Sequence, residues 1–337
     1  MMYEFLGISL VLAMLLTMNA LATMAAAGLW RVLRRPVSRW SARTRAEFLF
    51  VLRLGPPVIS ITWVAAFMVP SYLAYEPYTT NDVVSLKLGV LALISAVGVA
   101  AAIWRGVRSW LATRSLLHKW LAASIQIHLD EVTVPTFLMP HKFPIIAVVG
   151  TFRPRLFIAE HVLTTLTEEE LSAAISHEYG HMAAHDNLKR SLMRASRAAL
   201  MIIPCGRLLD RAWGEASESA ADEHAAQASS NVALELASAL VRIARMIPPQ
   251  QHFGMPTAVT SFFVGGEETR GVKARVRRLV ELASGDPSAF VSNAPFVRFV
   301  PWLTLMAIVA VSVTIESRPQ VLASIHHFIE HVVAVLG

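Results

Sequence analysis

The sequence is poor in cysteine and in charged residues. Cys205 is the single cysteine among 337 residues, which excludes an internal disulfide. Charged residues make up 16% and hydrophobic residues 55%, and the mean hydropathy is +0.50. This balance is too apolar for a typical soluble domain. The sequence also shows no phosphate-binding loop, Ser-His-Asp arrangement or internal repeat. The composition therefore indicates a protein embedded in a lipid bilayer.

Long uncharged segments recur along the chain and predict membrane spans. A hydrocarbon core of roughly 30 Å requires about 20 helical residues. We expect four spans, and Pro56, Pro57 and Pro70 should bend or limit the second one. A buried core helix is the alternative for the short fourth segment. The first segment has no basic region before it and is expected to be an uncleaved anchor. The expected spans are residues 1–30, 49–75, 87–104 and 295–316.

The placement of basic residues predicts the orientation in the membrane. Residues 31–48 hold six arginines and a single acid, Glu47, whereas residues 76–86 hold Glu76 and Asp82 and no base. Basic loops stay in the cytoplasm, so the first loop is expected inside and the second outside. Alternation then puts both termini outside the plasma (inner) membrane, and residues 105–294 in the cytoplasm. The net charge of +6 partly reflects this bias, so we expect no direct nucleic-acid binding.

A His-Glu-x-x-His motif occupies residues 177–181. His177 and His181 are four residues apart, so on a helix both imidazoles can reach one Zn²⁺ while Glu178 points at a metal-bound water. Upstream, Thr167 and Glu170 have the spacing of a capping box, which specifies a helix start. The sequence therefore predicts a helix that carries two zinc ligands and a general base.

A catalytic zinc site of this type requires a third protein ligand. Residues 215–223 are rich in Ala, Glu and Ser and predict a second helix, on which Glu218 can complete a His₂Glu site. Asp222, one turn further, can accept the spare N–H of a ligating imidazole. A solvated acidic helix face is the alternative interpretation. If Glu218 is not the ligand, His224 is the next candidate.

These motifs resemble those of the integral-membrane gluzincin peptidases. The matching residues are His177-Glu178-x-x-His181 followed by Asp186, and then Glu218-x-x-Ala221-Asp222. Among these peptidases, the chain is most similar to the peptidase region of the beta-lactam sensor-transducers of the BlaR/MecR type. It resembles the HtpX and CAAX proteases more distantly.

Two flanking segments add to the resemblance. Residues 150–158 resemble the Gly-x-x-Arg-Pro-x-Ile strand of the sensor-transducers, and residues 273–279 resemble their Lys-x-Arg-Ile segment. The resemblance implies that Asp186 caps the metal helix or anchors a neighbouring group. Arg275, on the second segment, is the candidate donor for the oxyanion. Because only residues 317–337 follow the last span, where these sensors carry a penicillin-binding domain, beta-lactam sensing is not expected.

Residues 105–294 are long enough for one domain with its own core. Residues 125–149 alternate apolar and polar positions between prolines and predict strands, and residues 155–158 predict another. We expect the rest to be helical. An edge strand at 145–149 or 155–158 could hold an extended substrate by strand addition; a role in the sheet core alone is the alternative. The further expected helices are the metal helix, residues 190–211, the Glu218 helix, and residues 232–246 and 272–283.

The C-terminal residues 317–337 contain a reversed motif, with His327, Glu330 and His331. Too few residues follow for a downstream ligand helix, and the expected topology puts the motif on the far side of the membrane from His177. Apolar residues fall on one helical face, and His326 lies with the motif on the other. We therefore expect an external amphipathic helix on the membrane or on the spans.

The expected fold is a mainly α membrane protein with four transmembrane helices. A cytoplasmic α+β zincin-like metallopeptidase domain lies between the third and the fourth. The expected activity is zinc-dependent endoproteolysis in signalling. The expected substrate is a cytoplasmic protein, either a repressor or the protein itself. The expected partners include a second copy of the chain in a homodimer. An HtpX-like quality-control protease is the main rival among enzymes. An inactive zinc-stabilised signalling scaffold is the alternative of another class, and the intact Glu178 argues against it.

Overall fold

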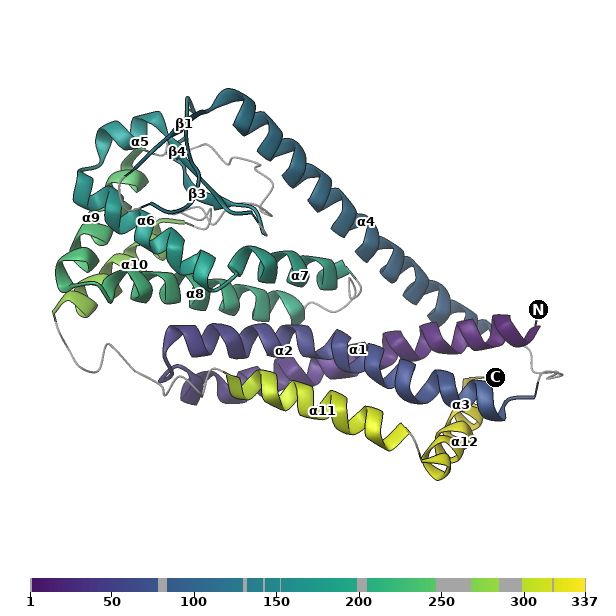
Figure 1. The fold of residues 1–337 in the computed structure, drawn as a ribbon. Helices are drawn as coiled ribbons and strands as arrows, with labels where there is room; N and C mark the ends of the chain where they lie inside the picture. The colour runs from purple at the N-terminus through teal and green to yellow at the C-terminus, as the bar shows by residue number, and fades with distance from the viewer. Residues whose placement is uncertain are drawn as a thin grey trace.

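The computed structural model describes residues 2–77, 84–129, 132–141, 143–151, 153–198, 205–246, 268–284, 299–316 and 318–336. Over these residues the protein is mostly helical, with one small mixed sheet (Figure 1). Long apolar helices form a bundle, and a helical domain with the sheet at its far side packs beside one end of it. Both chain termini lie at the opposite end of the bundle (Figure 1).

Three helices dominate the bundle: α1 (Met2–Val37), α2 (Ala42–Trp63) and α11 (Val300–Glu316). The stretch 31–48, expected as a basic loop, is mostly helical, because α1 continues to Val37 and α2 begins at Ala42. Ser41 caps α2 by accepting a hydrogen bond from the Thr44 amide, which satisfies a free donor of the first turn. Only residues 38–41 therefore connect the two helices.

The prolines of the second apolar segment affect its helix at one place only. The helix continues past Pro56 and Pro57 to Trp63, and the Ser60 hydroxyl donates to the Pro56 carbonyl at 2.7 Å. A five-residue π-helix η1 (Val64–Met68) then leads into α3 (Val69–Tyr75), which has Pro70 in its first turn. Because Pro70 has no N–H to donate, the wider π turn directly before it accommodates the missing hydrogen bond.

Three helical segments are long and apolar enough to cross a membrane: 2–37, 42–75 and 86–123. The apolar part of α11, Val300–Ser312, is shorter. Its side chains Leu303, Met306 and Val311 are more than half exposed, so α11 is not a buried core helix. Exposed apolar side chains of this kind are suited to lipid.

Helix α4 (Leu86–Ala123) links the bundle to the sheet as one unbroken helix (Figure 1). The span expected at 87–104 is therefore only its first half. At the other end, Trp120 is buried in the core of the domain, and its ring packs edge-on against Phe157 at 5.2 Å between centroids.

The sheet has the strand order β1-β2-β4-β3, in which β2 and β4 are parallel and the other pairs antiparallel. The strands expected from the alternating pattern therefore form. Gly150 in the β3–β4 turn has a φ of 109°, and an added Cβ would lie 2.6 Å from the Arg153 carbonyl oxygen, so this position requires glycine. The strands are β1 (Ile125–Ile127), β2 (Thr136–Met139), β3 (Ile146–Val149) and β4 (Arg155–Ala159).

Helices cover the sheet and form a core with it. The core joins β3 and β4 to α6, α9 and α10, and includes Ile146, Phe157, Ala174, Leu236 and Leu279. The segment expected as one helix over 190–211 consists of α7 and the start of α8, and residues 199–204 lie outside the described part. The helices are α5 (Glu160–Thr165), α6 (Glu168–Ala183), α7 (Asp186–Ala198), α8 (Cys205–Ala226), α9 (Ser230–Met246) and α10 (Glu268–Ala283).

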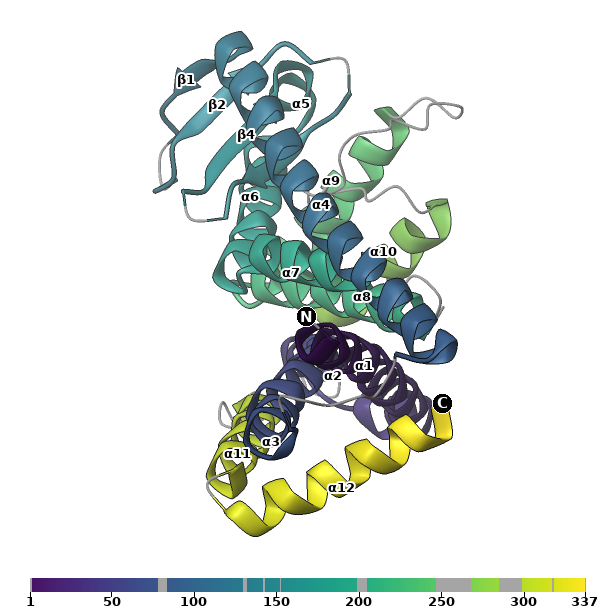
Figure 2. The ribbon, with the colours of Figure 1, turned by 90° about the vertical axis from the view of Figure 1, so that its right-hand side faces the viewer.

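Helix α12 (Pro319–Leu336) lies across the end of the bundle, with Ile329 buried against α1 and η1 (Figure 2). The Ser71 hydroxyl donates to the Leu322 carbonyl at 2.8 Å. His326, expected on the polar face, does lie 3.4 Å from Glu330 through its Nε2, but its side chain is only 11% exposed because its ring stacks on Tyr75. Helix α12 packs on α3, and this contact covers His326, which amphipathicity alone would place in water.

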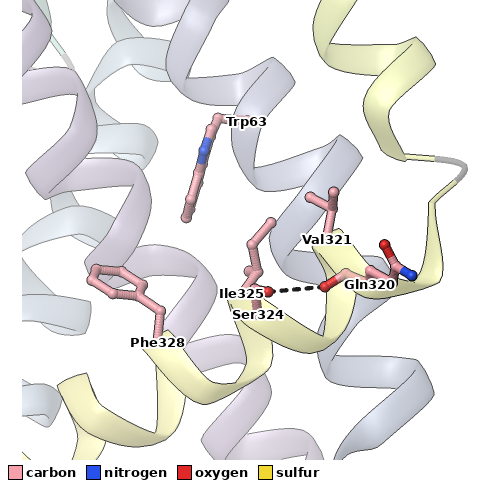
Figure 3. A pocket seen from close by; sticks show the side chains of 6 residues that line it. All are labelled: Trp63, Gln320, Val321, Ser324, Ile325 and Phe328. Atoms are coloured by element: carbon pink, nitrogen blue, oxygen red, sulfur yellow. Dashed lines mark hydrogen bonds between the residues drawn. The ribbon is translucent and has the colours of Figure 1, made fainter.

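A cavity of about 460 Å³ separates α12 from the Trp63 ring (Figure 3). Ile325 and Phe328 line its apolar wall, and Gln320 and Ser324 lie at the N-terminal part of α12. Phe328 is half exposed. The cavity is thus an apolar recess at the end of the bundle that is remote from the sheet.

Candidate metal centre

Helices α6 and α8 approach each other closely at Gly180. A Cβ added at Gly180 would lie 2.9 Å from the Ala221 Cα and 3.1 Å from the His224 Cβ, closer than side chains pack. Glycine on one helix and alanine on the other therefore permit the contact. This contact brings Glu218 of α8 next to the two histidines of α6.

The ligand atoms of His177, His181 and Glu218 lie within 4.8 Å of one another. The Glu218 carboxylate is 3.7 Å from His177 Nε2 and 3.6 Å from His181 Nε2. Both histidines are buried, whereas the Glu218 side chain is 23% exposed. Over the residues that the structure describes, no other group of three such side chains gathers in this way.

Three buried atoms at this centre make no hydrogen bond, and they show whether a metal fits. They are His181 Nε2, Glu178 Oε1 and Glu218 Oε2, the last of which faces Arg275 in an ion pair. Leaving such atoms unpaired in a protein interior is costly. A divalent cation would accept the His181 nitrogen and the Glu218 oxygen as ligands, and its bound water would donate to the Glu178 oxygen. Two imidazoles and one carboxylate are also the ligand set of a catalytic zinc, so the residues fit the ion.

Each histidine is held from behind by an aspartate. His177 Nδ1 is 2.9 Å from Asp222 Oδ1, and His181 Nδ1 is 2.7 Å from Asp186 Oδ2. An aspartate at Nδ1 fixes the tautomer in which Nε2 keeps its lone pair for the metal. The Ser217 hydroxyl donates to Asp186 at 2.6 Å and fixes that carboxylate in turn.

The tight turn between α6 and α7 explains why Asp186 can reach His181. Its residue His185 has a φ of 54°, the left-handed conformation that side chains other than glycine rarely adopt. His185 is thus part of the turn and lies outside the ligand cluster. His224, the fallback ligand, packs against Gly180 and is also outside that cluster.

Two arginines flank Glu218. Arg275 Nη1 lies 3.1 Å from Glu218 Oε2, and the same guanidinium donates twice to Asp222, at 2.9 and 2.6 Å. From the other side, Arg190 Nη2 donates to Glu218 Oε1 at 3.2 Å. Arg275, the candidate oxyanion donor, is therefore engaged by two carboxylates that support or form the ligand set. This geometry assigns it at least a role in positioning them.

Burial opposes every charge in the centre, and neighbouring charges decide the outcome. Burial alone would raise the pKa of Asp222, but the Arg275 guanidinium outweighs this effect and lowers the pKa to about 2. The pKa of Glu218 is held well below its usual range by His181 and Arg275, again against burial. His181, next to Glu218 and Asp186, has its pKa raised to about 10 despite burial. For His177, burial is the larger effect and lowers the pKa to about 4. The two carboxylates beside His181 thus favour positive charge at this position, which suits a bound cation.

Glu178 lies between the histidines and the edge of the sheet. Its Oε2 accepts a hydrogen bond from the Val148 amide of β3 at 3.0 Å. Burial raises the pKa of Glu178 to about 7. The side chain is therefore fixed at one oxygen, while the other is directed to no protein donor. This arrangement suits a group that exchanges a proton with water.

The sheet restricts where an extended substrate could add. Strand β4 is paired on both sides and cannot accept another strand, so the expected role at 155–158 is excluded. Strand β3 is an edge strand, but Asn187 Nδ2 donates to its Val148 carbonyl at 2.9 Å. Ile146 and Val148 are also nearly fully buried. Strand addition at β3 would therefore require the groups that cover this edge to move.

Several supporting residues were not foreseen from the sequence: Arg190, Ser217, Asn187 and Gly180. Ser217 directly precedes Glu218, and Arg190 lies one turn after Asp186, so helical spacing gives a weak signal for both. Gly180 inside the motif indicates a close helix contact, since glycine weakens a helix interior. The Asn187 contact with β3 has no local sequence signal.

Comparison with protein families agrees with this geometry. Residues 122–208 match the model of peptidase family M48. The matched stretch runs from the end of α4 to the first residues of α8, so it contains the sheet, His177, Glu178 and His181. It supports a zincin-type metallopeptidase. Glu218, Asp222 and Arg275 lie beyond the match, and the structure alone brings them to the histidines. A search of curated proteins gives no match.

Proposed function

We propose that this protein is a membrane-embedded zinc endopeptidase that hydrolyses peptide bonds in a protein substrate. The observation that carries this proposal is the convergence of His177, His181 and Glu218 beside a buried Glu178 oxygen that makes no hydrogen bond. A structural zinc site uses four protein ligands and requires no carboxylate base. The arrangement therefore favours an enzyme over an inactive zinc-stabilised scaffold.

A zinc ion at this position would supply Lewis acidity that lowers the pKa of water to about 7 and polarises the scissile carbonyl. The chain provides the remaining steps. Glu178 takes the water proton at Oε1 and delivers it to the leaving amine, while its Oε2 stays on the Val148 amide. Asp186 and Asp222 keep the imidazoles in the ligating tautomer. Arg190 and Arg275 orient Glu218.

The bundle supports a location in the membrane. Three helices are long and apolar enough to span, and the exposed apolar side chains of α11 support a fourth. Both termini lie at one end of the bundle (Figure 1), as expected for an even number of spans. The basic residues 31–45 lie at the other end, where the domain packs, so the positive-inside rule favours a cytoplasmic metal centre at the plasma (inner) membrane.

The proposed substrate is a cytoplasmic repressor or the protein itself, cleaved in response to a signal. This proposal rests on the resemblance to the sensor-transducers. Quality-control proteolysis of membrane proteins, as in the HtpX type, is the second candidate, and the membrane-adjacent position of the domain is compatible with it. Comparing cytoplasmic fragments from cells that carry wild type or Glu178→Gln would identify the substrates of either activity.

The Glu178→Gln substitution tests the catalytic proposal. The amide can still accept the Val148 hydrogen bond but cannot act as a base, so peptide hydrolysis should fall by about 10² to 10⁴. Zinc content, measured on the same purified protein, should remain at the wild-type level. Glu330→Gln, in the C-terminal helix, is the matched control and should hydrolyse normally. Undiminished hydrolysis by Glu178→Gln would rule out the proposed mechanism.

Cysteine labelling in intact cells tests the orientation. On a Cys205→Ser background, single cysteines at Ser229 or Ser284 should resist a membrane-impermeant maleimide. Cysteines at Thr79 or Ser317 should react. The reverse pattern would rule out cytoplasmic substrates and would indicate a protease that acts in the cell envelope.

A further inference from the structure

One side of α7 supports the metal centre. Asp186, at the start of this helix, bonds to His181, and Arg190, one turn later, bonds to Glu218. Two of the three metal ligands therefore depend on side chains from a single turn of α7. Any shift of that turn would change the positions of both ligands.

The same turn is attached to the membrane bundle. Lys189 lies between the two supporting residues, and its Nζ is 2.5 Å from Glu47 Oε1 of α2. Trp302 Nε1 of α11 donates to the other Glu47 oxygen at 3.0 Å. Lys189 also lies over the Phe50 ring, 5.7 Å from its centroid. Both charged side chains are mostly buried, Lys189 at 10% exposed and Glu47 at 16%.

We propose that Glu47 and Lys189 are positioning residues of the metal centre. Their ion pair fixes the first turns of α7 against α2 and so holds Asp186 and Arg190 at their ligands. The inference rests on the proposed function only in taking the bound ion to be zinc. A helix transmits a displacement along one turn nearly as a rigid body. Because the pair is mostly buried, removal of one partner leaves a poorly compensated charge at this contact.

The proposal gives the bundle a role beyond anchoring. Zinc affinity would depend on how α2 and α11 are placed against α7. A displacement of α2 relative to the domain would reach His181 through Asp186 and Glu218 through Arg190. The membrane helices would thereby form part of the structure that holds the metal.

A second ion pair across the same interface provides a matched control. Arg53 of α2 lies 2.8 Å from Asp210 of α8, and their side chains are 2% and 12% exposed. Asp210 is eight residues from Glu218, or about 12 Å along the helix. This pair joins α2 to α8, whereas Glu47 and Lys189 join α2 to α7.

The test measures the rate at which the zinc-loaded, full-length protein in lipid nanodiscs loses its metal to a chelator. Lys189→Met and Glu47→Gln should each release zinc about tenfold faster, the lower end of the effect of residues that support metal ligands. Lys189→Arg keeps the charge and should release zinc as slowly as the wild type. Arg53→Met should release zinc at the wild-type rate. Thermal unfolding of the metal-free variants reports separately on docking stability.

Two results would overturn the inference. Wild-type zinc release by Lys189→Met would show that the pair only docks the domain. Equal acceleration by Arg53→Met would show that any loosening of the interface acts on the metal, with no special role for α7. If the wild-type chain itself binds no zinc, the proposed function fails first and the inference fails with it.

Discussion

The chain contains two His-Glu-His clusters with opposite order, one on α6 and one on α12. In the first, each histidine is buried and its Nδ1 meets an aspartate from another part of the chain, Asp222 or Asp186. In the second, His327 is 79% exposed and its Nδ1 contacts Glu330 of the same helix at 3.3 Å. The two clusters share residue types and differ in what surrounds them.

The difference shows what turns a motif into a candidate site. Helix α6 has a second helix packed so closely at Gly180 that Glu218 joins its histidines. It also has α7, which anchors the second histidine from behind. Helix α12 has the cavity beside Trp63 on its apolar side, and on the other side His327 and Glu330 are exposed. A third ligand and buried anchors for Nδ1 therefore distinguish the first cluster.

The largest expected effect comes from removing the third ligand. Glu218→Ala should lose bound zinc and, with it, peptide hydrolysis, because two imidazoles alone hold zinc weakly. Metal content of the purified variant, measured by elemental analysis, checks this. Glu215→Ala, one turn earlier on α8 and exposed, is the control and should keep the metal. A stoichiometric zinc content in Glu218→Ala would place the third ligand elsewhere, with His224 next to be tested.

A smaller effect is expected from the anchor behind His181. Asp186→Asn keeps the size of the side chain but removes the charge that fixes the imidazole tautomer, so zinc affinity should fall about 10- to 100-fold. Competition with a chelator of known affinity measures the change. Ser217→Ala removes the bond to Asp186 and a longer contact of 3.5 Å with His181 Nδ1, but leaves the Asp186 carboxylate in place, so it should weaken binding less. Unchanged affinity in Asp186→Asn would mean that this carboxylate only caps the turn.

The smallest effect is expected from the second cluster. Replacing His327 and His331 together by alanine removes exposed side chains, and such changes usually alter stability by about 0.5 kcal/mol or less. Zinc stoichiometry and hydrolysis should match those of the wild type. A loss of bound metal in this double variant would reveal a second site on α12 and remove the contrast between the two clusters.

Local sequence signals predicted much of this arrangement. The capping box of Thr167 and Glu170 forms at the start of α6, because its bonds involve only residues within one turn. The strands follow from alternation over a few residues. Glu218 was predicted as the third ligand because a catalytic zinc requires one and an acidic helix follows the motif, whereas its proximity to the histidines is set by the contact between α6 and α8.

The remaining features depend on contacts between distant segments. Arg190 meets Glu218 because α7 folds back beside α8, which no local pattern specifies. His326 is buried because Tyr75 covers it, and amphipathicity cannot foresee such a neighbour. The excluded role of residues 155–158 has the same origin, since strand order decides which strand is at an edge. Helix α4 continues to Ala123 because its end packs into the core of the domain.

This unbroken α4 has a geometrical consequence. Its 38 residues extend about 57 Å, of which a bilayer core takes about 30 Å. The remaining length is a rigid spacer, and Trp120 near its end is buried in the core that contains the sheet. If α4 crosses the bilayer as proposed, the metal centre stands at a set height above the lipid. A peptidase centre held in this way would act at a fixed distance from the membrane surface.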